Sequence, residues 1–270
     1  MTQKPLILIV NDDGIHAPGI SALVQVAKKF GDVFVVAPDQ PQSGMGHAIT
    51  INSTIRVQKV NAHEGAEAWS CSGTPVDCVK MAVNKLLPRK PTLCLSGINH
   101  GANHSINIIY SGTMSAAMEG AIEGIPSIGF SLLDYSIDAD FSASAFYAEK
   151  IIASVLENGM EKGVCLNVNI PKLHVDEIKG VKVCRQAKGT WIEELDERTD
   201  PSGRKYYWLT GYYKDFEMGA QDTDAWALEN GFVSIVPSQF DMTAHHAIKS
   251  LGKMEHIEPK LNSGNPQVKK

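Results

Sequence analysis

The sequence lacks the two glycine-rich motifs by which many α/β proteins hold nucleotides. No GxGxxG follows the first predicted strand, because Gly44 and Gly46 come later and Ile49 stands where a third glycine would be needed. No GxxxxGK[ST] occurs anywhere in the 270 residues. The two commonest nucleotide cradles are therefore excluded.

The cysteines form neither a disulfide framework nor a zinc motif. Five cysteines are present, without a CxxC pair or a Cys/His zinc spacing, and Cys78, Cys94 and Cys165 lie in apolar segments. The chain also lacks an apolar run of membrane-spanning length and a cleavable leader pattern. We therefore expect free thiols, a cytoplasmic protein and no membrane contact.

Basic residues are not in excess. The chain has 25 Lys and Arg against 30 Asp and Glu, and its net charge is −5 at pH 7. A stable complex with nucleic acid is not expected, because such proteins normally present a basic face. Small anionic substrates remain compatible with this charge, since a metal ion or a helix terminus can supply local positive potential.

The first apolar run organises the rest of the chain. Leu6 to Val10 are branched and apolar, and they end abruptly in Asn11-Asp12-Asp13-Gly14. This pattern predicts a buried parallel strand with two carboxylates at its carboxyl end, where open α/β sheets bind ligands. Adjacent carboxylates repel each other unless a cation or strong donors compensate. Taken alone, the motif favours a plain Asp-Gly turn after the strand, and only the polar clusters elsewhere in the chain shift the interpretation toward a cation site.

The pattern then alternates between helices and strands to about residue 175, which indicates a doubly wound α/β fold. Helices are expected at 18–30, 74–87, 114–123 and 142–158, and buried strands at 33–37, 91–95, 126–131 and 164–170. Residues 49–60 and 66–70 alternate apolar and polar side chains, which predicts antiparallel strands inserted at the sheet edge.

The pattern changes after residue 180. Short strands are expected at 181–187 and 206–213, around a charged stretch at 193–205. This stretch is either a solvated hairpin tip or, with its aromatic neighbours, an oligomer contact. The predicted organisation is a core at 1–180, a projecting hairpin at 181–220, a return to the core at 221–255 with a short helix and a last strand, and a disordered tail at 256–270.

Polar clusters follow three separate predicted strands. They are Asp12-Asp13, the loop with Ser43, and a loop of about fifteen residues with Asn99, a length typical of functional loops. In a parallel sheet these clusters meet at one edge. Their carboxylate, hydroxyl and amide oxygens suit a hard divalent cation such as Mg²⁺ or Mn²⁺. Ser111-Gly112-Thr113 opens a helix and can donate to phosphate, although a simple cap explains this triplet equally well.

Together these clusters predict phosphoryl chemistry with a metal-activated water. The competing interpretation is a phosphoaspartate mechanism, but haloacid-dehalogenase phosphatases need Asp-x-Asp, whereas the two aspartates here are adjacent. Four histidines lie in or beside the clusters and are candidates for proton transfer. They are His16, His47, His100 and His104, and the sequence does not choose among them.

Several segments resemble the signature blocks of the SurE survival-protein family. They are NDDGIHAPGI, VVAPDQPQSGMGHAIT, SGTPVDCV, SGINHGAN and YSGTMSAAMEG, followed by LNVNIP and DTDAWALENGFVSIVP. The resemblance extends to about residue 237. It implies a Rossmann-like core with a hairpin extension, and a metal-dependent phosphatase for nucleoside 5′-monophosphates and often 3′-monophosphates. It also implies a cytoplasmic homodimer or homotetramer joined through its hairpins.

The resemblance also assigns roles to residues of this chain. The implied metal ligands are Asp12, Asp13, Ser43 and Asn99, of which Asp12, Asp13 and Asn99 are also predicted to be catalytic. The predicted phosphate and substrate contacts are Asn11, Gly44, Gly97, Gly101, Asn103, Ser111, Gly112 and Thr113. Two alternatives remain open, a phosphatase for short polyphosphate or sugar phosphates and a non-catalytic nucleotide-binding module.

Overall fold

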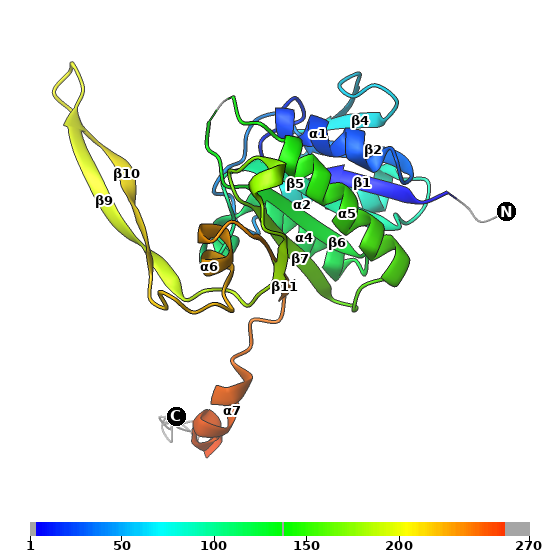
Figure 1. The fold of residues 1–270 in the computed structure, drawn as a ribbon. Helices are drawn as coiled ribbons and strands as arrows, with labels where there is room; N and C mark the ends of the chain where they lie inside the picture. Colours follow the sequence, from blue (N-terminus) through cyan, green and yellow to red (C-terminus); the bar gives the residue numbers. More distant parts are fainter. Residues whose placement is uncertain (1–3, 137, 257–270) are drawn as a thin grey trace, which may run out of the picture. The chain divides into compact units, whose positions relative to one another are not determined.

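The computed structural model describes residues 4–136 and 138–256 (Figure 1). The chain divides into two compact units, Met1–Phe240 and Asp241–Lys270. The second unit contains helix α7 (His245–Leu251) and the 3₁₀ helix η3 (Gly252–His256). Apart from His256, the tail predicted at 256–270 lies outside the described residues.

A nine-stranded sheet forms the centre of the first unit (Figure 1). Its strands are β1 (Leu6–Val10), β2 (Asp32–Pro38), β3 (Val57–Val60), β4 (Glu67–Cys71), β5 (Leu93–His100), β6 (Ser127–Leu132), β7 (Val164–Ile170), β8 (Val181–Val183) and β11 (Val233–Gln239). Their order is β3-β4-β2-β1-β5-β6-β7-β11-β8. The six strands from β4 to β7 are parallel, whereas β3 is antiparallel to β4 and β11 is antiparallel to β7. Strands β2, β1 and β5 are neighbours, so their carboxyl ends meet at one edge.

Helices cover both faces of the sheet, which explains why β1 is apolar without interruption. Ile7 and Ile9 belong to the core cluster on the side of α1 (Pro18–Ala27) and α5 (Ser142–Asn158). The other three residues of β1 belong to the cluster on the side of α2 (Pro75–Met81) and α4 (Gly112–Ile122). Because successive strand residues point to opposite faces, both sets must be apolar.

Short helical elements complete the first unit. They are the π-helical turn η1 (Ala82–Leu86), α3 (Asn107–Tyr110), the 3₁₀ turn η2 (Val175–Glu177) and α6 (Asp224–Glu229). The predicted cap of α2 is confirmed, since Thr74 and Asp77 form a capping box ahead of Pro75. Ser111 caps α4 and Thr223 caps α6 with a side-chain oxygen alone, which accepts from the backbone amides of Met114 and Trp226.

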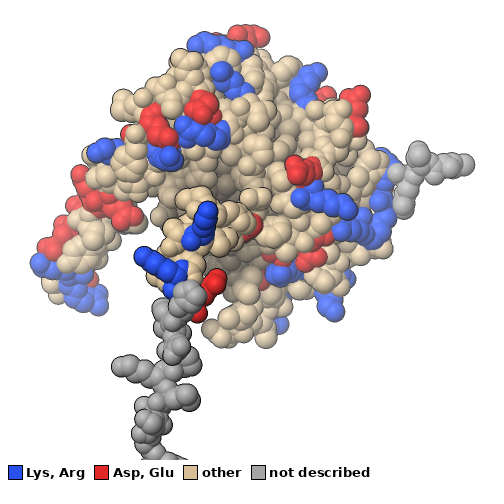
Figure 2. Space-filling view, turned by 90° about the horizontal axis from the view of Figure 1, so that it is seen from below, with Lys and Arg blue, Asp and Glu red and all other residues tan. Residues whose placement is uncertain are grey.

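A long hairpin projects from the first unit (Figure 1). Strands β9 (Gly189–Thr199) and β10 (Lys205–Asp215) pair antiparallel over their full length and form a sheet of their own. Several large apolar side chains on them are exposed, including Leu195 at 66% and Leu209 at 67%. On the face shown in Figure 2, acidic and basic residues are intermixed over the surface. Both kinds also occur on the limb that projects at the left of the view.

The structure corrects four of the expected strands, those at 49–60, 66–70, 91–95 and 181–187. Residues 49–56 form no strand, β3 is short, and only β3 is antiparallel, since β4 runs parallel to β2. Strand β5 continues through residues 96–100, because β6 pairs with Ser96, Asn99 and His100 across an irregularity in the register. Most of the charged stretch 193–205 belongs to β9, which replaces 181–187 as the partner of β10. Both faces of a projecting hairpin contact water, so its strands can form without an alternation of apolar and polar residues.

The predicted fold class is confirmed: the protein is mixed α/β with a mostly parallel central sheet and an antiparallel hairpin toward the C-terminus. Within residues 4–136 and 138–256, no helix is long and apolar enough to cross a membrane.

Candidate metal and phosphate site

A cavity of about 320 Å³ lies where β1, β2 and β5 end. Its polar wall contains Asp12 after β1, Ser43 after β2, and Asn99 and His100 at the end of β5. The start of α4 contributes Ser111. The structure therefore brings together the three polar clusters that the sequence placed at one edge of the sheet.

Two hydrogen bonds hold Asp12 in place. Asp12 is only 4% exposed, and the hydroxyl of Thr113 at the start of α4 donates to its Oδ1. The backbone amide of Gln42 donates to its carbonyl oxygen at 2.7 Å. Burial, and next the charge of Asp13, raise the pKa of Asp12 to about 6, while hydrogen bonds from Thr113 oppose the rise.

Gly112 is required by the close approach of α4 to Asp12. A Cβ atom at position 112 would lie 2.6 Å from the Cβ of Asp12 and 2.9 Å from its Oδ2. Any side chain there would displace the carboxylate or the helix. Gly112, which was predicted as a phosphate contact, therefore influences the site by allowing Asp12 its position.

Asn99 lines the cavity. Its amide nitrogen donates to the carbonyl oxygens of His100 at 3.0 Å and Gly101 at 2.6 Å, so the amide oxygen is the atom of this side chain that can serve as a metal ligand. Asp13 is engaged differently, because its Oδ2 is 3.2 Å from both the backbone nitrogen and Nδ1 of His100. Asp13 contacts His100, which lines the cavity, but Asp13 is not itself among the described lining residues.

The Ser43 loop is anchored on both sides of its exposed tip. Beyond Ser43, His47 Nε2 lies 2.9 Å from Glu119 Oε2, and the Thr50 hydroxyl donates to Asp77 at 2.6 Å. Before it, the Gln42 amide is bonded to Asp12. The hydroxyl of Ser43 is thus brought to the cavity by a loop tied to α2, α4 and the first strand turn.

The predicted phosphate contacts fall into two groups. Gly44, Gly101, Asn103 and Ser111 line the cavity. Gly101 already donates its amide to the carbonyl oxygens of Leu132 at 2.8 Å and Asp134 at 3.0 Å, and Ser111 Oγ accepts from Met114 N.

The other four predicted contacts are not among the described lining residues. Thr113 and Gly112 position Asp12, and Asn11 bonds across the turn to Gly14 at 2.9 Å. Gly97 packs where a Cβ would meet the carbonyl oxygen of Phe130 at 2.3 Å. These residues shape the site from behind its surface.

The structure separates the histidine candidates. His100 lines the cavity, and its ring packs edge-on against Phe141 with centroids 5.0 Å apart. His47 is paired with Glu119, and His104 is packed against Tyr213, where burial lowers its pKa. His16 is exposed.

One wall of the same cavity is aromatic, which the sequence does not predict. Tyr110, Tyr135 and Trp191 line it, together with Asn107. The sequence marks Trp191 only as an aromatic residue of the predicted hairpin, because nothing in it places residue 191 beside residues 99–111. Tyr110 opens the block YSGTMSAAMEG, whereas no motif marks Tyr135.

The donor set fits a hard divalent cation. Among residues 4–136 and 138–256, no group of three or more His, Cys, Asp and Glu side chains is placed to hold a metal. The candidate set instead combines carboxylates with a hydroxyl and an amide oxygen, which are ligand types that Mg²⁺ and Mn²⁺ accept. The raised pKa of Asp12 indicates a carboxylate whose charge is not compensated by the protein alone.

Comparisons with known proteins identify close relatives. The family model described as "Survival protein SurE" matches residues 7–193. A protein of Flavobacterium psychrophilum named "5'-nucleotidase SurE" is 59% identical over 94% of this chain and 98% of its own. A protein of Christiangramia forsetii with the same name is 62% identical over 92% of this chain and 96% of its own. The crystal structure of the SurE protein from Aquifex aeolicus aligns with a TM-score of 0.81, at 41% identity over 93% of this chain and 100% of that chain.

Proposed function

This chain belongs to the SurE family, as its motifs indicated, and from this premise we propose that it hydrolyses nucleoside 5′-monophosphates to nucleoside and phosphate with Mg²⁺ or Mn²⁺. The observation that carries the proposal is the convergence of Asp12, Ser43 and Asn99 on one cavity. The names of the relatives support a nucleotidase, and the donor set supports the metal requirement. Activity on 3′-monophosphates is proposed on the same basis.

One set of residues would hold a cation, and a second set would contact the substrate. Asp12, Asp13, Ser43 and Asn99 would hold the cation, which when bound supplies a Lewis acid and lowers the pKa of water. Thr113 and Gly112 keep Asp12 in position. Gly44, Gly101, Asn103 and Ser111 would contact the phosphate, with Asn11 and Gly97 shaping the wall. This list names roles that we propose.

Proton transfer is the role proposed for His100. Hydrolysis joins a water oxygen to phosphorus and breaks the bond to the 5′-oxygen, which needs a proton as it leaves. His100 is the one of the three histidines at 47, 100 and 104 that lines the cavity as described, and Asp13 orients its Nδ1. His47 and His104 would then have structural roles.

We also propose a cytoplasmic homo-oligomer, a dimer or a tetramer, that forms through its hairpins. The support is the exposed apolar surface of β9 and β10, which includes Trp208 at 58% and Leu209 at 67% exposure. Five free cysteines agree with a reducing compartment.

The test is phosphate release from a panel of nucleoside 5′- and 3′-monophosphates after metal removal and readdition of Mg²⁺ or Mn²⁺. Metal should restore release, and Asp12→Asn and Asn99→Ala should abolish it. Asp176→Asn is the control, because this side chain is 85% exposed. Release only from polyphosphate or sugar phosphates would contradict the substrate assignment. Nucleotide binding without any release would indicate a binding module.

A further inference from the structure

The cavity has two chemically different walls. The ends of β1, β2 and β5 provide its oxygen donors, whereas Tyr110, Tyr135 and Trp191 provide aromatic rings that the proposed metal chemistry does not use. At about 320 Å³ the cavity is at the small end of the range for small-molecule sites. Its aromatic side therefore has room for one flat ring system beside a phosphate.

Trp191 is fixed against the body of the protein although it belongs to the projecting hairpin. Its Nε1 donates to Oδ1 of Asn107 in α3 at 2.6 Å, and only 36% of the residue is exposed. The amide nitrogen of Asn107 in turn is 3.4 Å from the carbonyl oxygen of Ala102. The indole is thus held by its polar edge beside the loop that carries Asn99 and Asn103.

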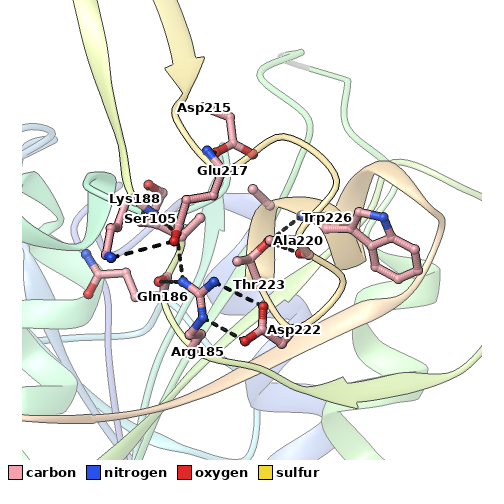
Figure 3. Close-up of polar contacts among 12 residues, drawn as sticks. Ser105, Arg185, Gln186, Lys188, Asp215, Glu217, Ala220, Asp222, Thr223 and Trp226 are labelled. Carbon is pink, nitrogen blue, oxygen red and sulfur yellow. Dashed lines mark hydrogen bonds and ion pairs between the residues drawn. The ribbon is translucent and has the colours of Figure 1, made fainter.

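Polar contacts join the two chain segments at the root of the hairpin (Figure 3). The guanidinium of Arg185 donates to Asp222 at 2.8 and 3.1 Å and to Glu217 at 2.7 Å, which ties the chain entering β9 to the chain leaving β10. Glu217 also accepts from the backbone amide of Lys188 at 2.9 Å. The contacts of Glu217 with Arg185 and Lys188 therefore fix the position at which β9 starts, two residues before Trp191.

Asp224 connects this root directly to the loop of the cavity. The residue is fully buried, and its two oxygens accept from the backbone amides of Ala187 and Ser105, each at 2.8 Å. The Ser105 hydroxyl donates back to the carbonyl oxygen of Ala187 at 2.9 Å. These hydrogen bonds therefore hold the root of the hairpin against the loop that follows β5.

Tyr135 is placed by a glycine on the facing side. A Cβ at Gly101 would lie 2.3 Å from Cε1 of Tyr135, so the ring can cover the loop only because residue 101 has no side chain. Tyr110 ends α3 immediately before Ser111, which caps α4. Aromatic side chains from three separate segments thus meet beside the predicted phosphate contacts.

We propose that this aromatic wall is a nucleobase subsite in which Trp191 stacks on the base of the substrate. The proposal rests on the proposed nucleotidase function and deepens it by naming the residue that separates nucleotides from other phosphomonoesters. Stacking accepts every base, because all bases have a π-face. The Trp191 donor and the Asn107 acceptor are already bonded to each other, so the pair is committed to holding the ring rather than to identifying the base.

The test compares a ligand that has a base but no phosphate with one that has a phosphate but no base. Adenosine is titrated by calorimetry into metal-loaded wild type, Trp191→Ala and Trp191→Phe, and KM and kcat are measured for AMP and ribose 5-phosphate. Phe146→Ala is the control, because Phe146 is an exposed aromatic residue of α5 that does not line the cavity as described and lies outside the hairpin.

Trp191→Ala should weaken adenosine binding and raise the KM for AMP by about 5-fold to 100-fold. Its kcat for AMP and its constants for ribose 5-phosphate should change little, which also shows that the variant is folded. Trp191→Phe should recover most of the loss, and Phe146→Ala should match wild type.

Equal losses for AMP and ribose 5-phosphate would overturn the proposal, because they would indicate a structural role for Trp191. Unchanged adenosine affinity in Trp191→Ala would also overturn it. If adenosine binds through Trp191 but no nucleotide is hydrolysed, the nucleotidase proposal fails while the base subsite stands.

Discussion

The hydroxyl of Thr113 donates a hydrogen bond to Oδ1 of Asp12, joining residues 101 positions apart in the sequence. The bond connects the end of the first strand to the first turn of α4, where the helix dipole also favours negative charge. It explains why a buried carboxylate beside a second carboxylate can keep one orientation.

Thr113→Val should reduce kcat/KM for AMP by about 10-fold to 100-fold, because hydrogen bonds to charged groups contribute about 1.5–3 kcal/mol. Thr113→Ser keeps the hydroxyl and should retain most of the activity. Steady-state kinetics at saturating metal would measure both variants. Equal activity of the Val and Ser variants would show that the bond does not position Asp12.

The metal-free protein should lose stability as the pH rises from about 4 to about 6. The pKa of Asp12 is 3.8 in the unfolded chain and about 6 in the folded protein, so in this window the native state holds a proton that the unfolded state has released. Above about pH 6 the ionised, buried carboxylate destabilises the fold by about 2–3 kcal/mol.

Asp12→Asn tests this linkage. With a chelator present, the variant should resist urea better than wild type at pH 7.5, and the difference should shrink at pH 4.5. The same difference at both pH values would contradict the assignment of the raised pKa to Asp12.

His100→Ala should lower kcat by about 100-fold or more, as expected for loss of a group that transfers a proton. His47→Ala should change kcat much less, because the partner of His47 is Glu119 and the described cavity wall does not include it. A kcat in His100→Ala equal to that of His47→Ala would remove His100 from the proton-transfer role.

Asp224→Ala should destabilise the protein by about 2–4 kcal/mol, because it leaves the buried amides of Ser105 and Ala187 without their acceptor. Asp222→Ala is the matched control, since this side chain is 68% exposed and its pair with Arg185 contributes less than about 1 kcal/mol. Urea unfolding would compare the two. Asp224→Ala should also weaken adenosine binding, because Asp224 ties the hairpin root to the loop at Ser105.

Local chemistry made much of the fold predictable. The uninterrupted apolar run 6–10 predicts a strand covered on both faces, and Thr74-Pro75 with Asp77 predicts a capped helix start; both are confirmed. The bounds of α5 and β7 agree with the expected ranges 142–158 and 164–170, since a long amphipathic helix and a buried strand each end at a clear glycine or proline. The family was also recognisable, because its motifs are contiguous.

Strands with polar sequences were harder to predict. Residues 96–100 are polar in part, yet they continue β5, because β6 pairs with them across an irregularity between Ser96 and Asn99. The charged residues of β9 form a strand because β10 satisfies their backbone and water solvates both faces. In both segments the partner strand, which is distant in sequence, decides the conformation.

By itself, the sequence determined the alternation of strands and helices, the family, and the oxygen-rich character of the candidate site, because each of these is written in short contiguous stretches. Only the tertiary structure decided which of the site residues face the cavity and which support it from behind. It placed Thr113 on Asp12, paired His47 with Glu119 and brought Trp191 to the aromatic wall. Those relationships depend on how the hairpin root and α4 pack against β1 and β5, and no local pattern records a contact between segments so far apart in the chain.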